Sequence, residues 1–189
     1  MEADSGKPGI LKRWTDSVPH VDELIISANW KEGYAKPINR GLKLAKGDYL
    51  LVSNDDLIWD YGDIYDLCKP DIVTSPMVNG HYQNFWGCCF MIPRIVYEKI
   101  GGMYEGYKIS FYDDDEYLCN LYKASVKVRG IKAVNVIHPE GGRTLHTFED
   151  HDSFSEENKK KFIERWGYEP PAIYSFYEAN QRLPLKGEI

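Results

Sequence analysis

The residues most suited to chemistry are Asn54, Asp55 and Asp56, which follow directly after a short apolar run, Tyr49 to Val52. The length and residue types of this run are typical of a buried parallel strand. Adjacent carboxylates at the end of a buried strand are costly to desolvate unless a cation lies between them. The stretch therefore predicts a site for a divalent metal and a phosphate. The alternative is a solvated turn, in which Asn and Asp simply end the strand.

A second acidic cluster, Asp113 to Glu116, begins a predicted helix. Asp114 shares one helical face with Leu118 and Leu121, so we expect its side chain to point inward. Asp113 and Glu116 are expected to fall away from that face. An inward carboxylate that is ionised at pH 7 can act as a general base. The helix N-terminus lowers its pKa and neighbouring carboxylates raise it, so the sign of the net shift stays open. The alternative is ordinary acidic charge in the first turn of a helix.

Two histidines, His138 and His146, flank a glycine-containing turn late in the chain. A histidine at the end of a strand can complete a metal site begun by Asp56, because Mn²⁺ accepts mixed carboxylate and imidazole ligands. Arg143 in the same turn could bind a phosphate. Either histidine could instead be structural.

These residues need a sheet to bring them together. Helical spacing, capping residues and apolar runs predict helices at 10–17, 37–46, 93–100, 113–125 and 153–166, and strands at 22–28, 49–52, 71–75, 88–92 and 126–136. Strand, helix and strand joined by short turns is the pattern of a parallel sheet. We expect a flexible N-terminus over 1–9, one domain over 10–167 and an extended tail over 168–189.

Composition narrows the function. With 189 residues and 43% hydrophobic content the chain fits one globular domain. A net charge of −6 argues against nucleic acid as a partner. The four cysteines form no CxxC pair, no run approaches the ~18–20 apolar residues of a membrane span, and the first residues do not form a signal peptide. These features predict a cytoplasmic protein without a membrane span.

Seven segments in a fixed order carry a family resemblance. They are Gly33 to Leu42, Ala45 to Asp56, Phe85 to Arg94, Ile100 to Glu105, Tyr112 to Leu118, His138 with the glycines after it, and Asn158 to Gly167. In this order and spacing they resemble the family 2 glycosyltransferases of the GT-A fold, over residues 22–167. Each segment is a weak signal alone, and the specificity comes from their order.

The resemblance implies a single α/β domain with a GT-A-type, Rossmann-like mixed and mostly parallel sheet flanked by helices. It implies an inverting, hexosyltransferase-type reaction that moves a sugar from a UDP-, GDP- or dTDP-sugar to a hydroxyl of a glycan or another acceptor. Mn²⁺ or Mg²⁺ would neutralise the charge on the leaving diphosphate. The aromatic tail could cover the acceptor site or pack on another subunit of a homo-oligomer.

The resemblance also implies a role for individual residues. Asn54-Asp55-Asp56 stands where the family has its DxD-type motif, with Asp56 on the metal and Asp114 as the general base. His138 is the better match to the family's late histidine, and His146 is the reserve. Donor binding is assigned to Asn39, Asn54, Asp55 and Arg143, and the acceptor side of the sugar pocket to Trp86, Gly87 and Asp113.

One departure bears on the donor site. Family members usually open with a strand that helps to hold the nucleotide base, whereas this chain resembles an N-terminally shortened version that starts at or near the first helix. Two other functions therefore stay open. One is a sugar- or nucleotide-binding module with the same fold and impaired catalysis. The other is a nucleotidyltransferase, which would need a glycine-rich phosphate loop near the start.

Overall fold

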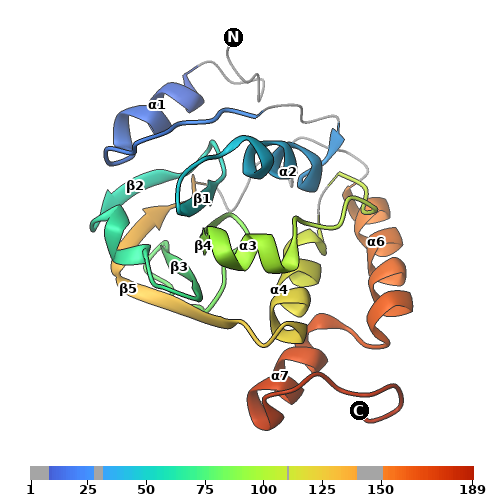
Figure 1. Ribbon diagram of the computed structural model, residues 1–189. Coiled ribbons are helices and arrows are strands. Elements are labelled where there is room, and N and C mark those ends of the chain that lie inside the picture. Colours follow the sequence, from blue (N-terminus) through green and yellow to red (C-terminus); the bar gives the residue numbers. More distant parts are fainter. Residues whose placement is uncertain (1–8, 28–31, 110, 140–150) are drawn as a thin grey trace.

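A five-stranded mixed sheet organises the protein (Figure 1). The computed structural model describes residues 9–27, 32–109, 111–139 and 151–189. The strands are β1 (Tyr49–Ser53), β2 (Ile58–Tyr61), β3 (Ile72–Val78), β4 (Cys89–Pro93) and β5 (Lys127–Ile137), in the order β1-β4-β3-β5-β2. The helices are α1 (Ile10–Ser17), α2 (Ala35–Leu44), the 3₁₀ helix η2 (Ile64–Leu67), α3 (Arg94–Ile100), α4 (Asp113–Lys123), α6 (His151–Trp166) and α7 (Pro170–Asn180).

Strand pairing is mostly antiparallel. β1 pairs with β4, β4 with β3, and β2 with β5 in antiparallel fashion, and only β3 and β5 run parallel. The mixed sheet is confirmed, but the expected excess of parallel pairing is wrong for the described strands. Local patterns predict strands and leave their partners open, because pairing is decided by the connections between distant segments.

The predicted strand at 22–28 is not formed by its described residues, 22–27, which run as an extended segment without strand pairing. Leu24 and Ile26 are 47% and 49% exposed, so the apolar run that suggested a buried strand is half in solvent. β1 is consequently an edge strand. The short strand β2 was not predicted from the sequence, and among the described strands it pairs with the distant β5.

The main core lies between the sheet and the helices that follow it. Val52, Phe90 and Ile92 from β1 and β4 pack with Tyr117 and Leu121 from α4. Every residue of β4 is buried, because this strand has neighbours on both edges and helices against its face. The burial of Tyr117 and Leu121 anchors α4 and so fixes where its acidic N-terminus lies.

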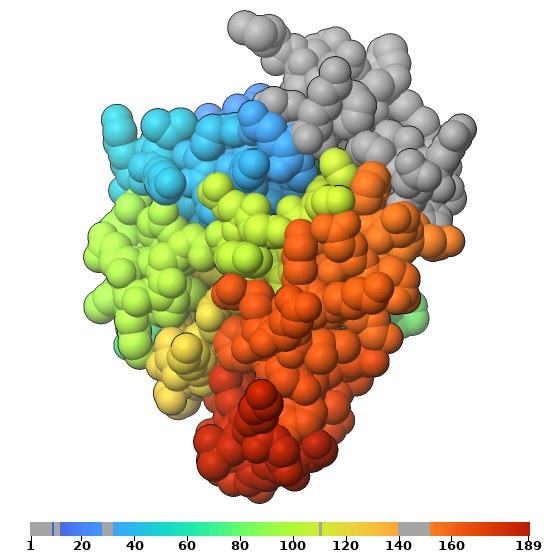
Figure 2. Space-filling view, turned by 90° about the vertical axis from the view of Figure 1, so that its right-hand side faces the viewer, coloured from blue at the N-terminus to red at the C-terminus, as the bar shows by residue number. Residues whose placement is uncertain are grey.

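The C-terminal residues form helices α6 and α7, which pack beside α4 on the side away from α1 (Figure 1). In Figure 2 their surface, orange to red, makes up the lower part of one face of the molecule. The expected extended tail over 168–189 is therefore wrong for 170–180. Pro170 and Pro171 occupy the first helical positions, where proline is favoured because the missing N–H is not needed. No helix in the described part of the chain has the length and apolar character needed to cross a membrane.

Candidate active site

The end of β1, the start of β4 and the N-terminus of α4 meet at Cys88. Asn54 N donates to Cys88 O at 2.9 Å, which holds the Asn-Asp-Asp stretch against the residue before β4. Burial raises the pKa of the Cys88 thiol to about 12, and the negative charges of Asp114 and Asp56 add to the rise. Both predicted carboxylates therefore act on the same thiol. The structure brings together residues that are 58 positions apart in the sequence.

Gly87 packs directly against Asp114. A Cβ added at Gly87 would lie 2.4 Å from Asp114 Cβ and 2.5 Å from Asp114 Oδ2, so no larger residue fits without displacing the carboxylate. The neighbouring Trp86 anchors the same turn through its main-chain N, which donates to Ser75 Oγ at 3.0 Å. Trp86 Nε1 is buried and has no hydrogen-bond partner. These contacts place Gly87 beside Asp114, and the assignment of Trp86 and Gly87 to the acceptor side of the sugar pocket stays a prediction.

Tyr34 is a site residue that sequence reasoning missed. Its hydroxyl donates to Gly87 O, and burial followed by the charge of Asp114 raises its pKa well above the ordinary value. Tyr34 immediately precedes α2, so it links the start of that helix to the turn that carries Gly87. The only signal in the sequence is an aromatic residue beside Gly33, which does not distinguish a site residue from a core residue.

Asp56 and His138 form a second contact at this end of the sheet. His138 Nε2 lies 3.4 Å from Asp56 Oδ2, and the two side chains are 14% and 9% exposed. The main chain of His138 is fixed by Asn79, whose Oδ1 accepts from His138 N and whose Nδ2 donates to His138 O. His138 Nε2 has no hydrogen-bond partner. His146 and Arg143 lie outside the described residues, and no group of three or more potential metal-ligating side chains occurs within the described ones.

The acidic cluster of α4 is more deeply buried than expected. Asp113 and Glu116 were both expected to lie off the single buried face of the helix, but the first is 3% exposed and the second is fully buried, so the expectation of one buried face is wrong. A single-face pattern fails here because α4 has the sheet on one side and α6 and α7 on another (Figure 1).

Burial also settles the sign of the pKa shifts in this cluster. Desolvation, with the charge of Asp114 second, raises the pKa of Asp113 to about 8. Burial raises the pKa of Asp114, which accepts a bond from Asp115 N at 3.1 Å. Burial raises the pKa of Asp115 to about 6, although the Tyr174 hydroxyl opposes the rise.

Glu116 locks α4 to α6. Its carboxylate accepts hydrogen bonds from Tyr107 Oη at 2.8 Å, Trp166 Nε1 at 2.6 Å and Arg165 Nη2 at 2.8 Å. The Arg165 guanidinium also lies 3.8 Å above the Tyr104 ring. A fully buried carboxylate that accepts this many hydrogen bonds is held in a fixed place. The network therefore holds the N-terminal turn of α4, and with it Asp113 and Asp114, in position.

The backbone before α4 is strained. Phe111 and Tyr112 have φ angles of 74° and 71°, a region that non-glycine residues rarely adopt and that costs about 1–3 kcal/mol each. Asn158 of α6 compensates, since its Nδ2 donates to Phe111 O at 3.2 Å and to Lys108 O at 2.9 Å. Strain of this kind is retained where the surrounding structure enforces it, which is common at functional sites.

The side chain of Asn39, which was predicted to bind the donor, makes its hydrogen bonds to other groups of the protein. It is 6% exposed, and its side chain bonds both main-chain groups of Met103 and the Glu105 carboxylate. The structure shows Asn39 anchoring the loop after α3, and a donor contact for it stays an untested prediction. Asp55 is partly buried beside Asp56, and its assignment to the donor site also stays a prediction.

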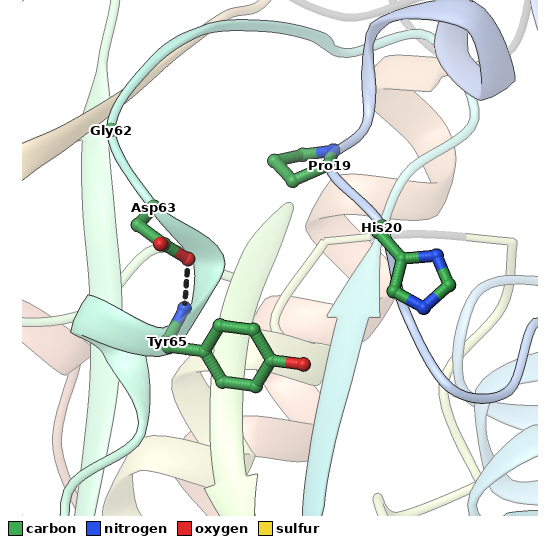
Figure 3. A pocket seen from close by; sticks show the side chains of 5 residues that line it. All are labelled: Pro19, His20, Gly62, Asp63 and Tyr65. Carbon is green, nitrogen blue, oxygen red and sulfur yellow. Dashed lines mark hydrogen bonds between the residues drawn. The ribbon is translucent and has the colours of Figure 1, made fainter.

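Two cavities have linings that include none of Asp56, Asp114 and His138. One, of about 380 Å³, is lined by Pro19, His20, Gly62, Asp63 and Tyr65 (Figure 3). Asp63 Oδ1 accepts from Tyr65 N at 2.9 Å and so fixes the start of η2. The other, of about 460 Å³, lies between β1, α2 and the segment after α1.

Comparison with known proteins identifies the fold. Residues 9–71 match the model of the glycosyl transferase family 2. This is the segment that contains Tyr34 and the Asn-Asp-Asp end of β1. This match covers a third of the chain and shows a similarity of that segment to the family.

Solved structures support the GT-A assignment. A mannosyltransferase from Pyrobaculum calidifontis in complex with GDP-Man and Mn²⁺ aligns with a TM-score of 0.52 and 17% identity, over 94% of this chain and 56% of that one. GalNAc-T7 with UDP, GalNAc and Mn²⁺ aligns with a TM-score of 0.57 and 15% identity, over 79% of this chain and 38% of that one. The GT-A chain described here thus spans less than two thirds of the length of either structure. No curated protein sequence matches it.

Proposed function

We propose that this protein is an inverting, metal-dependent glycosyltransferase that moves a sugar from a nucleoside-diphosphate-sugar to an acceptor hydroxyl. In this reaction the hydroxyl oxygen bonds to the anomeric carbon while the bond from that carbon to the diphosphate breaks. The diphosphate leaves with the electron pair, and the hydroxyl proton passes to a base. A chain of this kind therefore needs a base on one side of the sugar and a group that stabilises the diphosphate on the other.

The proposal rests on the location of three buried polar atoms that have no hydrogen-bond partner. Trp86 Nε1, Asp113 Oδ2 and His138 Nε2 are buried without a hydrogen bond. Buried polar groups are nearly always paired, so these atoms are available to bind a ligand, an ion or water. They belong to the turn before β4, the start of α4 and the residue after β5, and these segments contact or contain Asp114 and Asp56.

Asp56 and His138 are suited to hold a divalent cation. A carboxylate oxygen and an imidazole nitrogen 3.4 Å apart offer two ligands of the types that Mn²⁺ accepts. A bound cation would stabilise the charge that develops on the leaving diphosphate. The Mn²⁺ complexes of the two aligned GT-A structures support this assignment. His146 and Arg143 stay candidates for further ligand and phosphate contacts.

Asp114 is suited to accept the proton. Its carboxylate lies against Gly87, beside the turn that carries Trp86, so an acceptor bound there could reach it. Its raised pKa makes it a stronger base than an exposed aspartate. Burial raises the pKa of the neighbouring Asp113 to about 8, so Asp113 holds its proton at neutral pH.

The first experiment is thermal unfolding with UDP, GDP, dTDP and CDP, each with and without Mn²⁺. A diphosphate at a hundred times its dissociation constant stabilises the protein by about 2.7 kcal/mol. We expect one diphosphate to stabilise the protein only when Mn²⁺ is present, and the effect to be lost in Asp56→Asn and His138→Ala. Transfer from the matching sugar donor should then be lost in Asp114→Asn, which keeps diphosphate binding.

Two results would reject the proposal. If no diphosphate stabilises the protein with either Mn²⁺ or Mg²⁺, the chain has no donor site. If a diphosphate binds and Asp114→Asn still transfers sugar at the wild-type rate, the base is assigned wrongly. Asp71→Asn is a suitable control because Asp71 is exposed and asparagine tolerates its positive φ of 58°.

A further inference from the structure

A tight turn at the end of β3 contacts the main chain of His138. Val78 and His81 exchange two main-chain hydrogen bonds, from Val78 N to His81 O at 3.1 Å and from His81 N to Val78 O at 2.9 Å. Asn79 and Gly80 lie between them, with φ angles of 52° and 75°. Asparagine and glycine are favoured in such two-residue hairpin turns because both tolerate a positive φ. The turn thus explains the backbone of Asn79, but it requires no contact of the Asn79 side chain.

The side chain of Asn79 takes the place of the next main-chain bond between β3 and β5. These strands run parallel with Val78 opposite Val136, and Asn79 N continues the ladder by donating to Val136 O at 2.9 Å. In a regular parallel ladder the main-chain oxygen of the same residue would accept from His138 N. Because the chain turns at this point, Asn79 Oδ1 accepts from His138 N instead, at 2.9 Å. Asn79 Nδ2 donates to His138 O at 3.1 Å, so one side-chain amide binds both main-chain groups of His138.

Asn135 ties the same turn to the sheet. It is 4% exposed, its Oδ1 accepts from Gly80 N at 3.0 Å, and its Nδ2 donates to Asp60 Oδ2 at 2.8 Å. Asn135 belongs to β5 and Asp60 to β2, so the turn is fixed to the two strands that follow β3 in the sheet. A turn held in this way is a rigid support for Asn79, and through it for His138.

We propose that Asn79 is a positioning residue for metal binding and that it acts through His138. The His138 side chain is 14% exposed, and its Nε2 lies 3.4 Å from Asp56 Oδ2. By fixing the main chain of His138, Asn79 sets where the imidazole stands relative to Asp56. Metal sites depend on such supports, because a ligand displaced by a fraction of an ångström binds the cation more weakly. This role rests on the proposed function, since it requires that Asp56 and His138 hold a divalent cation.

Manganese affinity in a matched set of variants tests this role. Asn79→Gly removes both side-chain bonds to His138, and the turn should stay intact because glycine adopts a positive φ without steric cost. The control is Asn84→Gly in the same loop, where Asn84 is exposed and its Oδ1 accepts from Tyr82 Oη at 3.1 Å. The dissociation constant for Mn²⁺ is measured from the electron paramagnetic resonance signal of the free ion. If the wild type binds Mn²⁺ only together with UDP, GDP, dTDP or CDP, that diphosphate is present in every measurement.

We expect Asn79→Gly to bind Mn²⁺ about tenfold more weakly than the wild type, which is the usual cost of removing a group that orients a metal ligand. Asn84→Gly should bind Mn²⁺ as the wild type does. In a His138→Ala background, Asn79→Gly should change the affinity by less than about twofold, because the ligand that Asn79 positions is gone. Without metal, the His138 amide should exchange about tenfold faster in Asn79→Gly than in the wild type. The urea midpoint of Asn79→Gly should stay close to that of Asn84→Gly, since water replaces bonds lost at the surface.

Several outcomes would overturn this role for Asn79. Equal Mn²⁺ affinity of Asn79→Gly and the wild type would show that the metal site does not need Asn79, and would leave the proposed function intact. An equal loss of affinity with and without His138 would show that Asn79 does not act through that residue. Unchanged exchange of the His138 amide in Asn79→Gly would show that the side chain does not hold it. If the wild type binds Mn²⁺ neither alone nor with any of the diphosphates, the metal site of the proposed function is rejected, and the role of Asn79 with it.

Discussion

Replacing Asp113 by asparagine should remove most of the pH dependence of stability near neutrality. Asp113 is 3% exposed, and burial raises its pKa from an ordinary 3.8 to about 8. Between these values the folded protein keeps the proton that the unfolded chain releases. The contribution of Asp113 to the free energy of unfolding is therefore fully present below about pH 4 and is lost as the pH rises toward 8. Asparagine has nearly the same shape and stays neutral in both states.

The size of the effect follows from this one proton. A difference of one bound proton changes the free energy of unfolding by about 1.4 kcal/mol per pH unit. Between pH 5 and pH 7 the wild-type protein should lose about 3 kcal/mol more stability than Asp113→Asn. The number is an upper value, because Asp114 shares the cluster and part of the titration is common to both groups.

Urea unfolding followed by the fluorescence of the five tryptophans measures this difference. With a slope of about 2 kcal/mol per molar urea, the wild-type midpoint should fall by about 1.5 M relative to the variant between pH 5 and pH 7. The exposed Asp71→Asn serves as control and should follow the wild type. Parallel pH profiles for wild type and Asp113→Asn would refute the buried, protonated state of Asp113.

Two further predictions concern the surroundings of the site. Glu116→Gln removes the carboxylate that pairs with Arg165 and weakens three hydrogen bonds to a fully buried side chain. The free energy of unfolding, measured by urea titration, should therefore fall by about 2–3 kcal/mol. A change below about 0.5 kcal/mol would contradict the role given to this network. Gly87→Ala places a methyl group 2.4 Å from Asp114 Cβ, so sugar transfer should fall by about tenfold or more while the protein stays folded. An unchanged transfer rate in Gly87→Ala would show that the position of Asp114 is not critical.

The sequence alone determined the local elements and most of the chemistry-bearing residues. Apolar runs and glycine or proline ends are enough to place α1, α2, β1 and α4 close to where the structure has them. Asp56, Asp114 and His138 were predicted as site residues because they lie at the ends of predicted strands and at the start of a predicted helix, and because of the family resemblance. Their roles stay predictions, and the structure shows that Asp56 and Asp114 both lie near Cys88 and that Asp56 contacts His138.

Only the tertiary structure decided how these elements pair and which side chains are buried. The antiparallel pairing of β1 with β4, and the lack of strand pairing between segment 21–27 and the described residues, leave no local signal in the sequence. Asp113 and Glu116 are buried because α6 and α7 cover a second face of α4. The sequence pattern of α4 predicts one buried face only, and so predicts that these two residues lie off that face. Charge at a helix start looks the same in sequence whether water or protein surrounds it, and that surrounding sets the pKa values on which the proposed chemistry depends.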